Sequence, residues 1–202
     1  RHPSEGAQNK RDQLPRTAGN MRAKLTRQAR RCSRWPIFCI ALLAAVPVAA
    51  VDFFLKPSAF LAETFEGTVP EPDRLWLKDP LKKRIRAILG AELGSLRVKY
   101  WARDGRTAWI LDAIGRDRPI TAGFVIEEGR VVRVAILIYR ESRGWEVRYP
   151  FFTDQFFGAQ LIEDDALDRN IDGITGATLS VRAITGLSKV ALLLHREARK
   201  IA

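Results

Sequence analysis

The sequence predicts an α+β domain, an antiparallel sheet with flanking helices, preceded by an N-terminal transmembrane or signal segment. Three observations predict this fold: a helical pattern opens the folded part, several short strand patterns follow it, and an amphipathic helix closes the chain. We expect a basic and largely disordered tail over residues 1–34, a transmembrane anchor or signal segment over 35–55, a linker over 56–78 and the folded domain over 79–202.

Most of the net charge of +11 lies in the tail. Residues 1–34 hold ten Lys/Arg and two Asp/Glu, a net charge of +8, whereas residues 35–202 hold 24 and 21, a net charge of +3. A nucleic-acid-binding domain carries its positive charge on the folded part, so we expect no nucleic-acid partner. Met21 is the single methionine, and translation from Met21 is an alternative to a start further upstream.

An uncharged apolar run from Ile37 to Val51 follows a block of six basic residues. Such a block stays on the cytoplasmic side, so the domain after it is expected on the periplasmic face of a bacterial inner membrane. The run is shorter than the ~20 residues of a spanning helix, and Trp35 and Phe53–Leu55 extend it. Val48–Ala50 also suits signal cleavage, so a single-pass anchor, which we favour, and a cleaved periplasmic form both stay open.

A helix is expected from Asp79, because Asp79-Pro80 combines a capping residue with a proline at the first helical position. Its apolar residues recur on one face, and Gly94 is a plausible stop. The prolines of residues 56–78 indicate a linker with some local packing.

Strand patterns cover residues 97–103, 107–113, 120–126 and 131–139. Residues 127–130 are typical of a hairpin turn, and the apolar strand that follows is expected at the centre of the sheet, covered on both faces. The closing helix places these apolar residues on one side: Ala183, Leu187, Val190, Ala191 and Leu194. His195 is expected to be exposed or partly buried in its last turns, and the Cys and His spacing predicts no metal site.

The segment Asp172–Ser180 is the most informative one. Small residues and hydroxyl groups stand just before the closing helix, where backbone amides and the helix dipole favour an anion. Gly176 permits close approach of a ligand to the backbone, and Thr175, Thr178 and Ser180 supply hydroxyl donors. A bound phosphate suits this arrangement, although a simple helix cap has the same pattern.

Residues Asp172–Thr178 also resemble the Asp-x-x-Ser/Thr-Gly-Ala-Thr signature of the bacterial FMN-binding domain family. This family includes the covalent-FMN subunits of sodium-translocating NADH:quinone reductases and Rnf-type complexes. Residues Pro119–Tyr139 are similar to its glycine-containing hairpin, with Gly123 and Gly129. Residues Glu141–Gly144 resemble its Glu-Thr-Pro-Gly loop, with Ser142 and Arg143 as departures, and the likeness covers about residues 96–200.

The resemblance implies FMN bound covalently through a phosphoester on Thr178. A magnesium-dependent flavin transferase that uses FAD as donor would make this bond, with Asp172 in its recognition signature or as a turn residue. The implied FMN-contacting residues are Asp172, Gly173, Thr175, Gly176, Ala177, Thr178, Leu179, Glu141, Ser142, Arg143, Gly144 and Trp145.

The isoalloxazine ring has several candidate contacts. Aromatic side chains could stack on it or pack in the core: Trp109, Trp145, Phe151, Phe152, Phe156 and Phe157. Arg143 could place positive charge near the ring or be a solvated loop residue.

We therefore expect an electron-transfer flavoprotein subunit, rather than a stand-alone enzyme, that passes electrons between membrane or periplasmic redox proteins. A regulatory or assembly module of a respiratory pathway that binds FMN, and a flavin-free protein of the membrane surface, are the alternatives. No catalytic triad, metal spacing or nucleotide-binding glycine pattern is found in the sequence.

Overall fold

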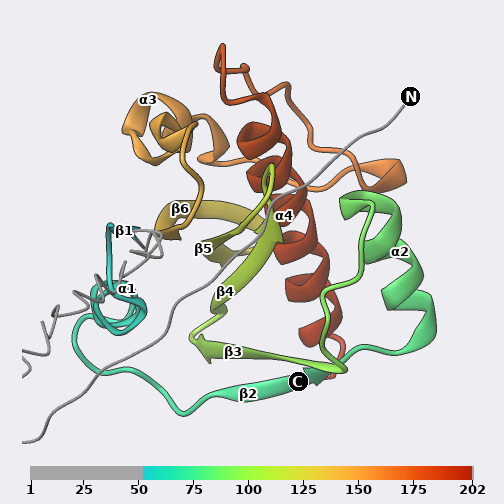
Figure 1. Cartoon of the computed structure of the whole chain (residues 1–202). Coiled ribbons are helices and arrows are strands. Elements are labelled where there is room, and N and C mark those ends of the chain that lie inside the picture. Colours follow the sequence, from blue (N-terminus) through green and yellow to red (C-terminus); the bar gives the residue numbers. More distant parts are fainter. Residues whose placement is uncertain (1–51, 202) are drawn as a thin grey trace, which may run out of the picture. The chain divides into compact units, whose positions relative to one another are not determined.

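The computed structural model of the chain describes residues 52–201, so the predicted tail and the apolar run Ile37–Val51 lie outside the described part. Six antiparallel strands form one sheet in the order β1-β6-β5-β4-β3-β2 (Figure 1). The strands are β1 Asp52–Phe53, β2 Asp73–Trp76, β3 Arg97–Arg103, β4 Arg106–Ile114, β5 Pro119–Glu127 and β6 Arg130–Tyr139. The helices are α1 Pro57–Thr64, α2 Asp79–Leu89, α3 Pro150–Thr153 and α4 Thr178–Ala198, with 3-10 turns η1 Trp145–Arg148, η2 Asp154–Phe156 and η3 Glu163–Asp165. The predicted α+β class is confirmed.

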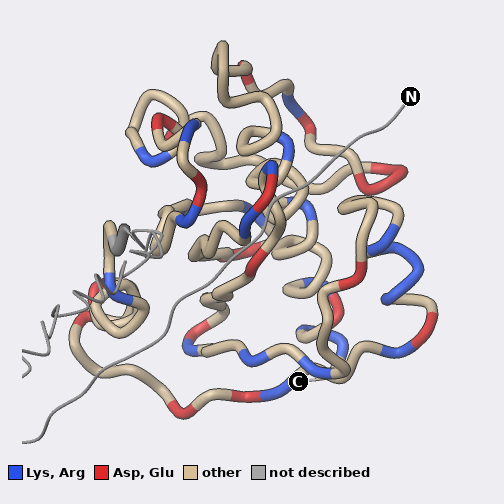
Figure 2. Tube along the Cα trace, viewed as in Figure 1, with Lys and Arg blue, Asp and Glu red and all other residues tan. Residues whose placement is uncertain are grey.

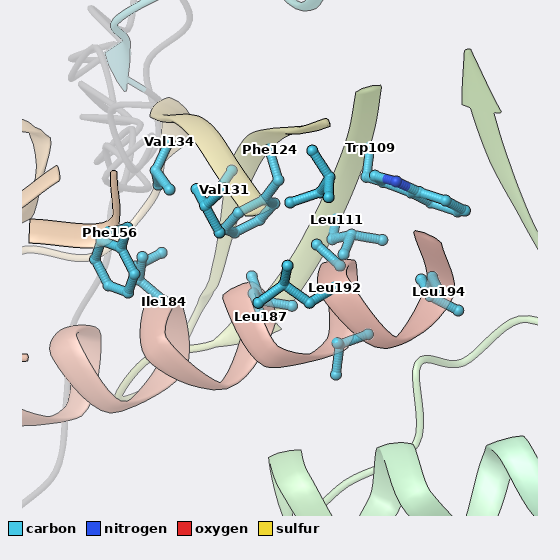
Figure 3. Close-up of a cluster of buried hydrophobic side chains, with 14 of the residues drawn as sticks. Trp109, Leu111, Phe124, Val131, Val134, Phe156, Ile184, Leu187, Leu192 and Leu194 are labelled. Atoms are coloured by element: carbon cyan, nitrogen blue, oxygen red, sulfur yellow. The ribbon is translucent and has the colours of Figure 1, made fainter. Parts of the chain in front are cut away.

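The sheet is covered on both faces, by α1 on one side and by α4 with α2 behind it on the other (Figure 1). Strand β4 illustrates the consequence: Trp109 and Leu111 belong to the core under α4, whereas Ala108 packs in the cluster under α1. Figure 3 shows side chains of the sheet meeting those of α4 in the larger core. Each fully buried large apolar side chain contributes roughly 1.5–3 kcal/mol, so α4 and the sheet stabilise each other strongly.

Residues 56–78 differ from the predicted linker, because they contain α1 and β2. Pro57 stands at the start of α1, a position where proline favours a helix instead of breaking it. The fully buried Phe60 ring lies directly over β5, since a Cβ atom at Gly123 would be 2.6 Å from the Phe60 Cζ atom. Gly123 therefore serves packing between α1 and the sheet.

The four predicted strands correspond to β3, β4, β5 and β6, and the β5–β6 hairpin turns at Glu128-Gly129, both of which have positive φ. Strand β6 is covered on both faces as expected, but it lies beside the two-residue edge strand β1 instead of at the centre. Because Asp52 and Phe53 pair with Tyr139 and Ile138, the predicted segment 35–55 overlaps the edge strand of the sheet at residues 52–53.

Helix α2 begins at Asp79 as predicted and ends at Leu89, where Gly90 in the left-handed conformation (φ 72°) terminates it before the predicted Gly94. It packs on α4 at Gly186, where a Cβ atom would meet the Leu89 Cδ2 atom at 2.9 Å. Within residues 52–201, no helix combines the length and the apolar character needed to cross a membrane.

Charged residues of both signs are interspersed along the described trace, including α2 and the loops around it (Figure 2). This agrees with the small net charge of residues 35–202 and with the absence of a basic stripe in the sequence of the domain.

Candidate functional site

The signature segment forms the loop before α4 and the first turn of that helix. Thr178 is the first helical residue and is exposed, whereas Ala177 before it is buried. Gly176 has φ 84° and no atom within 4 Å of a Cβ atom built on it, so the backbone beside Thr178 faces open space. The hydroxyl of Thr178 is therefore accessible and next to a stretch of backbone that a ligand can approach.

The amino terminus of α4 is uncapped within the described residues. Its N-cap residue is Ala177, whose side chain cannot accept a hydrogen bond, and the first turn holds no acidic residue. The first amides of a helix lack intrahelical partners, and the dipole of this 21-residue helix adds positive potential at the same end. This end suits a phosphate group.

The loop after β6 packs directly against the first turn of α4. Gly144 has φ 84°, and a Cβ atom there would lie 2.8 Å from Ser180 Oγ and 3.2 Å from Ala177 Cβ. Both the left-handed conformation and the short contact require glycine at this position. The structure thus brings the predicted loop 141–145 and the signature together.

The side chain of Tyr139 supports the contact between the loop after β6 and the first turn of α4. Its hydroxyl donates a hydrogen bond to the Arg143 carbonyl at 2.6 Å and lies 2.9 Å from Ser180 Oγ. Burial raises the pKa of the Tyr139 hydroxyl, so the hydroxyl remains a donor at neutral pH. Ser180 is buried and its hydroxyl lies beside that of Tyr139, and a contact between Ser180 and a phosphate stays a prediction.

Glu141 joins the same loop to the β4–β5 turn. Its Oε1 atom accepts hydrogen bonds from the backbone N–H groups of Arg116, Asp117 and Arg118 at 2.6, 2.8 and 2.9 Å. One carboxylate oxygen therefore holds the turn in place, which is a role in shaping the site. A contact between Glu141 and FMN stays a prediction.

A groove of about 400 Å³ adjoins the first turns of α4. The loop after α2, the end of β4 with its turn, and α4 form its walls. Ile114 and Leu179, which both line it, are 60% and 40% exposed, and Arg182 lies on the same wall one turn after Thr178. The groove is lined mainly by apolar residues, and its charged residues are Arg182, Glu92 and Asp112. Concave, mostly apolar surfaces with a few polar groups are the usual binding sites of small molecules.

Three of the predicted ring-stacking residues belong to the core instead. Trp109, Phe152 and Phe156 have no exposed surface, and their rings pack against neighbouring core residues. Trp145, next to Gly144, is 42% exposed, and Arg143 is exposed as well. Trp145 therefore retains free surface, as do Phe151 and Phe157, which are 61% and 66% exposed.

Asp172 is exposed, and its backbone N–H donates to Gln155 Oε1 at 2.6 Å. The Gln155 amide in turn donates to the Phe151 carbonyl at 3.2 Å, so the signature loop is tied to α3 and η2. Sequence reasoning missed Gln155 and Tyr139 as residues that support the site. Neither belongs to a motif, and no signal in the sequence distinguishes them.

A comparison with protein families supports an FMN-binding domain of a flavoprotein. Residues 115–193 match the family model described as the FMN-binding domain. The match runs from the β4–β5 turn through the loop after β6 and the signature into α4, and it supports a bacterial FMN-binding domain over residues 115–193. No curated protein and no solved structure gave a significant match.

Proposed function

We propose that this protein carries FMN on Thr178 through a phosphoester bond and passes electrons between redox partners at the outer face of a bacterial membrane. The observation that carries the proposal is the position of Thr178. Its accessible hydroxyl stands at the uncapped amino terminus of α4, between the open backbone at Gly176 and the groove beside Leu179.

The described residues fit this group. The free amides of the first turn of α4 and the backbone at Gly176 would hold the phosphate, and Leu179 and Ile114 would cover one face of the ring from water. Arg182 on the groove wall would place a positive charge near the bound cofactor. FMN, when bound, supplies the redox chemistry of the protein.

Formation of the bond needs outside help, because a threonine hydroxyl is a weak nucleophile at neutral pH and needs a base or a metal. Within the described residues no side chain is hydrogen-bonded to Thr178 that could serve as that base. A magnesium-dependent transferase would supply the base and the metal. In that reaction the Thr178 oxygen would bond to the flavin-side phosphorus of FAD and the bond between the two phosphates would break. AMP would leave, and the hydroxyl proton would pass to the transferase.

The basic block and the apolar run Ile37–Val51, which precede the domain directly, support the proposed export. Outside the cytoplasm a dissociated cofactor is not replaced, which favours a covalent bond. Membrane or periplasmic redox proteins would then be the partners.

The test is expression of the full chain with and without a flavin transferase, followed by intact-mass and peptide analysis. We expect an FMN-sized addition on the peptide that contains Thr178, and only with the transferase. Thr178→Val, which removes the hydroxyl but keeps the shape, should stay unmodified, whereas Thr178→Ser should retain modification. An unmodified wild-type peptide, beside a control protein that the same transferase does label, would overturn the covalent attachment.

The electron-transfer step needs a separate measurement. The flavin of membranes that contain the protein should be reduced and reoxidised as fast as respiration turns over. A bound flavin that changes its redox state far more slowly than that would favour a regulatory module.

A further inference from the structure

Three aromatic residues with free surface lie close together in the sequence and in space. Trp145, Tyr149 and Phe151, which we call the aromatic edge, are 42%, 37% and 61% exposed. The rings of Trp145 and Tyr149 are 5.7 Å apart, and those of Tyr149 and Phe151 are 6.1 Å apart. Contiguous exposed apolar surface of this kind marks an interaction site more often than ordinary surface.

Arg148 connects the aromatic edge to Phe54, which follows the outer strand β1. Its guanidinium lies 4.4 Å from the ring centre of Phe54, 4.8 Å from that of Trp145 and 4.9 Å from that of Tyr149. Such contacts between a cation and aromatic faces orient the rings. The aromatic edge is therefore a fixed surface of the fold, attached through Arg148 to Phe54, the residue that follows β1.

The position of β1 shows where the preceding chain enters the domain, and therefore what lies near the aromatic edge. Strand β1 is antiparallel to β6 and begins at Asp52, opposite Tyr139, while Phe54 and Leu55 already bond to the Leu137 carbonyl. The chain therefore enters the domain at the Tyr139 end of β6, where the loop to η1 begins. The uncharged run Ile37–Val51 ends at the residue just before this point.

We propose that the aromatic edge docks on the surface of the phospholipid bilayer that holds the apolar run. Tryptophan and tyrosine side chains favour the boundary between acyl chains and headgroups, because one part of each ring system is apolar and one atom can hydrogen-bond. Arg148 and the exposed Arg143 add positive charge for anionic headgroups. This inference rests on the anchored form of the proposed function.

Docking of the aromatic edge on the bilayer would also bring the signature segment close to the membrane surface. Gly144, the neighbour of Trp145, contacts Ser180 and Ala177 at the start of α4. In Figure 1, α3 and the loop before α4 lie at the same end of the domain. Thr178 would thus be held close to the headgroups, within reach of a redox partner embedded in the membrane.

The test compares a tryptophan placed at two exposed positions of the full, FMN-loaded chain in vesicles of phosphatidylethanolamine and phosphatidylglycerol. Phe151→Trp reports on the aromatic edge. Leu96→Trp is the matched control, because Leu96 is 64% exposed and lies next to β3, at the opposite side of the sheet from β1. Quenching by lipids brominated near the headgroup is measured against the same lipids without bromine, relative to the wild-type chain.

We expect bromolipid quenching of the added tryptophan at position 151 and none at position 96. Equal quenching at the two positions would overturn the docking. Shielding of position 151 from aqueous iodide without bromolipid quenching would also overturn it, in favour of a protein partner or a second copy of this chain.

Two further readings on the same samples separate this inference from the proposed function. Flotation of the vesicles reports the anchor, and intact mass reports FMN on Thr178. Chains that float and carry FMN but lack quenching at position 151 would refute the docking alone. Chains that do not float would refute the anchor and the docking together, whereas quenching without FMN would uphold the docking and refute the covalent flavin.

Discussion

The hydroxyl groups of Tyr139 and Ser180 lie 2.9 Å apart, which connects the end of β6 to the first turn of α4. The same Tyr139 hydroxyl donates to the Arg143 carbonyl at 2.6 Å. Since Thr178 is two residues before Ser180, the candidate attachment point is held by the sheet through this contact and not by the signature segment alone.

Tyr139→Phe should destabilise the fold by ~1 kcal/mol and slow attachment of FMN, because Ser180 and the Arg143 carbonyl both lose a buried partner. Tyr100→Phe is the control, since the Tyr100 ring stacks on Trp109 and its hydroxyl makes no hydrogen bond within the described residues. Urea denaturation and the time course of FMN incorporation measure the two effects. Equal incorporation by the two variants would contradict the supporting role of Tyr139.

Gly144→Ala should cost roughly 1–3 kcal/mol and abolish most FMN loading, because the added methyl group meets Ser180 Oγ in a strained backbone conformation. Gly129→Ala carries the same backbone strain at the β5–β6 turn, where no atom lies within 4 Å of the added carbon. We expect Gly129→Ala to lower the free energy of unfolding but to keep FMN loading. Loss of loading in both variants would attribute the effect to general instability.

Glu141→Ala should loosen the β4–β5 turn, because three backbone N–H groups lose the oxygen that accepts from them. These groups are exposed and can turn to water, so we expect a cost of only ~1 kcal/mol. Faster hydrogen exchange at residues 116–118 is the measurement, with Glu141→Gln expected to be intermediate. Asp117→Ala removes a carboxylate of the same turn and should leave the exchange at Arg118 unchanged.

His195 should make stability depend on pH. It is 2% exposed, and its Nδ1 atom lies 2.7 Å from Thr107 Oγ1, which itself accepts a hydrogen bond from the Trp109 indole. The direction of the hydrogen bond between Thr107 and Nδ1 depends on the tautomer of His195, and Nε2 has no partner within the described residues. Burial, followed by the charge of Arg199, lowers the pKa of His195 from 6.5 to about 4.

Between pH 6.5 and about 4 the unfolded chain therefore binds a proton at His195 that the folded chain does not. The contribution of neutral His195 to the free energy of unfolding is fully present above pH 6.5. It decreases as the pH falls through this range, by up to roughly 3 kcal/mol. His195→Asn keeps a group that can form a hydrogen bond near the Nδ1 position but does not titrate, so its free energy of unfolding should depend less on pH. A slope equal to that of the wild-type chain would refute this role.

The sequence predicts the elements that depend on local periodicity. The strands of residues 97–139 alternate or run apolar over their whole length, and the five apolar residues named for the closing helix are all buried in α4. The hairpin at Gly129 follows from one glycine between two such runs. Those features need no knowledge of distant contacts.

The elements before Asp79 could not be predicted, because each is short and its residues gain stability only from the sheet. Strand β1 has two residues, and α1 starts at Pro57, a residue that in isolation indicates a linker. What makes α1 a helix of the domain is the space over Gly123 that Phe60 fills. That space exists only once the sheet has formed.

For the candidate site, the signature around Thr178 is a local pattern and was accessible to sequence reasoning. Its supports are not local: Gln155 holds Asp172 across 17 residues, and Tyr139 reaches Ser180 across 41. For Trp109 the sequence leaves two environments open, because its aromatic side chain suits a flavin contact as well as the core. The position of β4 beneath α4 is what places Trp109 in the core.

Because β1 has only two residues, its release from the sheet would lengthen the connection between the domain and the preceding chain. Two residue pairs hold β1 to β6, so its detachment disturbs far less of the sheet than the loss of any other strand would. Each residue released lengthens the connection to the preceding chain by roughly 3.3 Å. Release of Asp52 and Phe53 alone would lengthen the connection by two such steps, while Phe54 keeps its contacts with Tyr139 and Arg148.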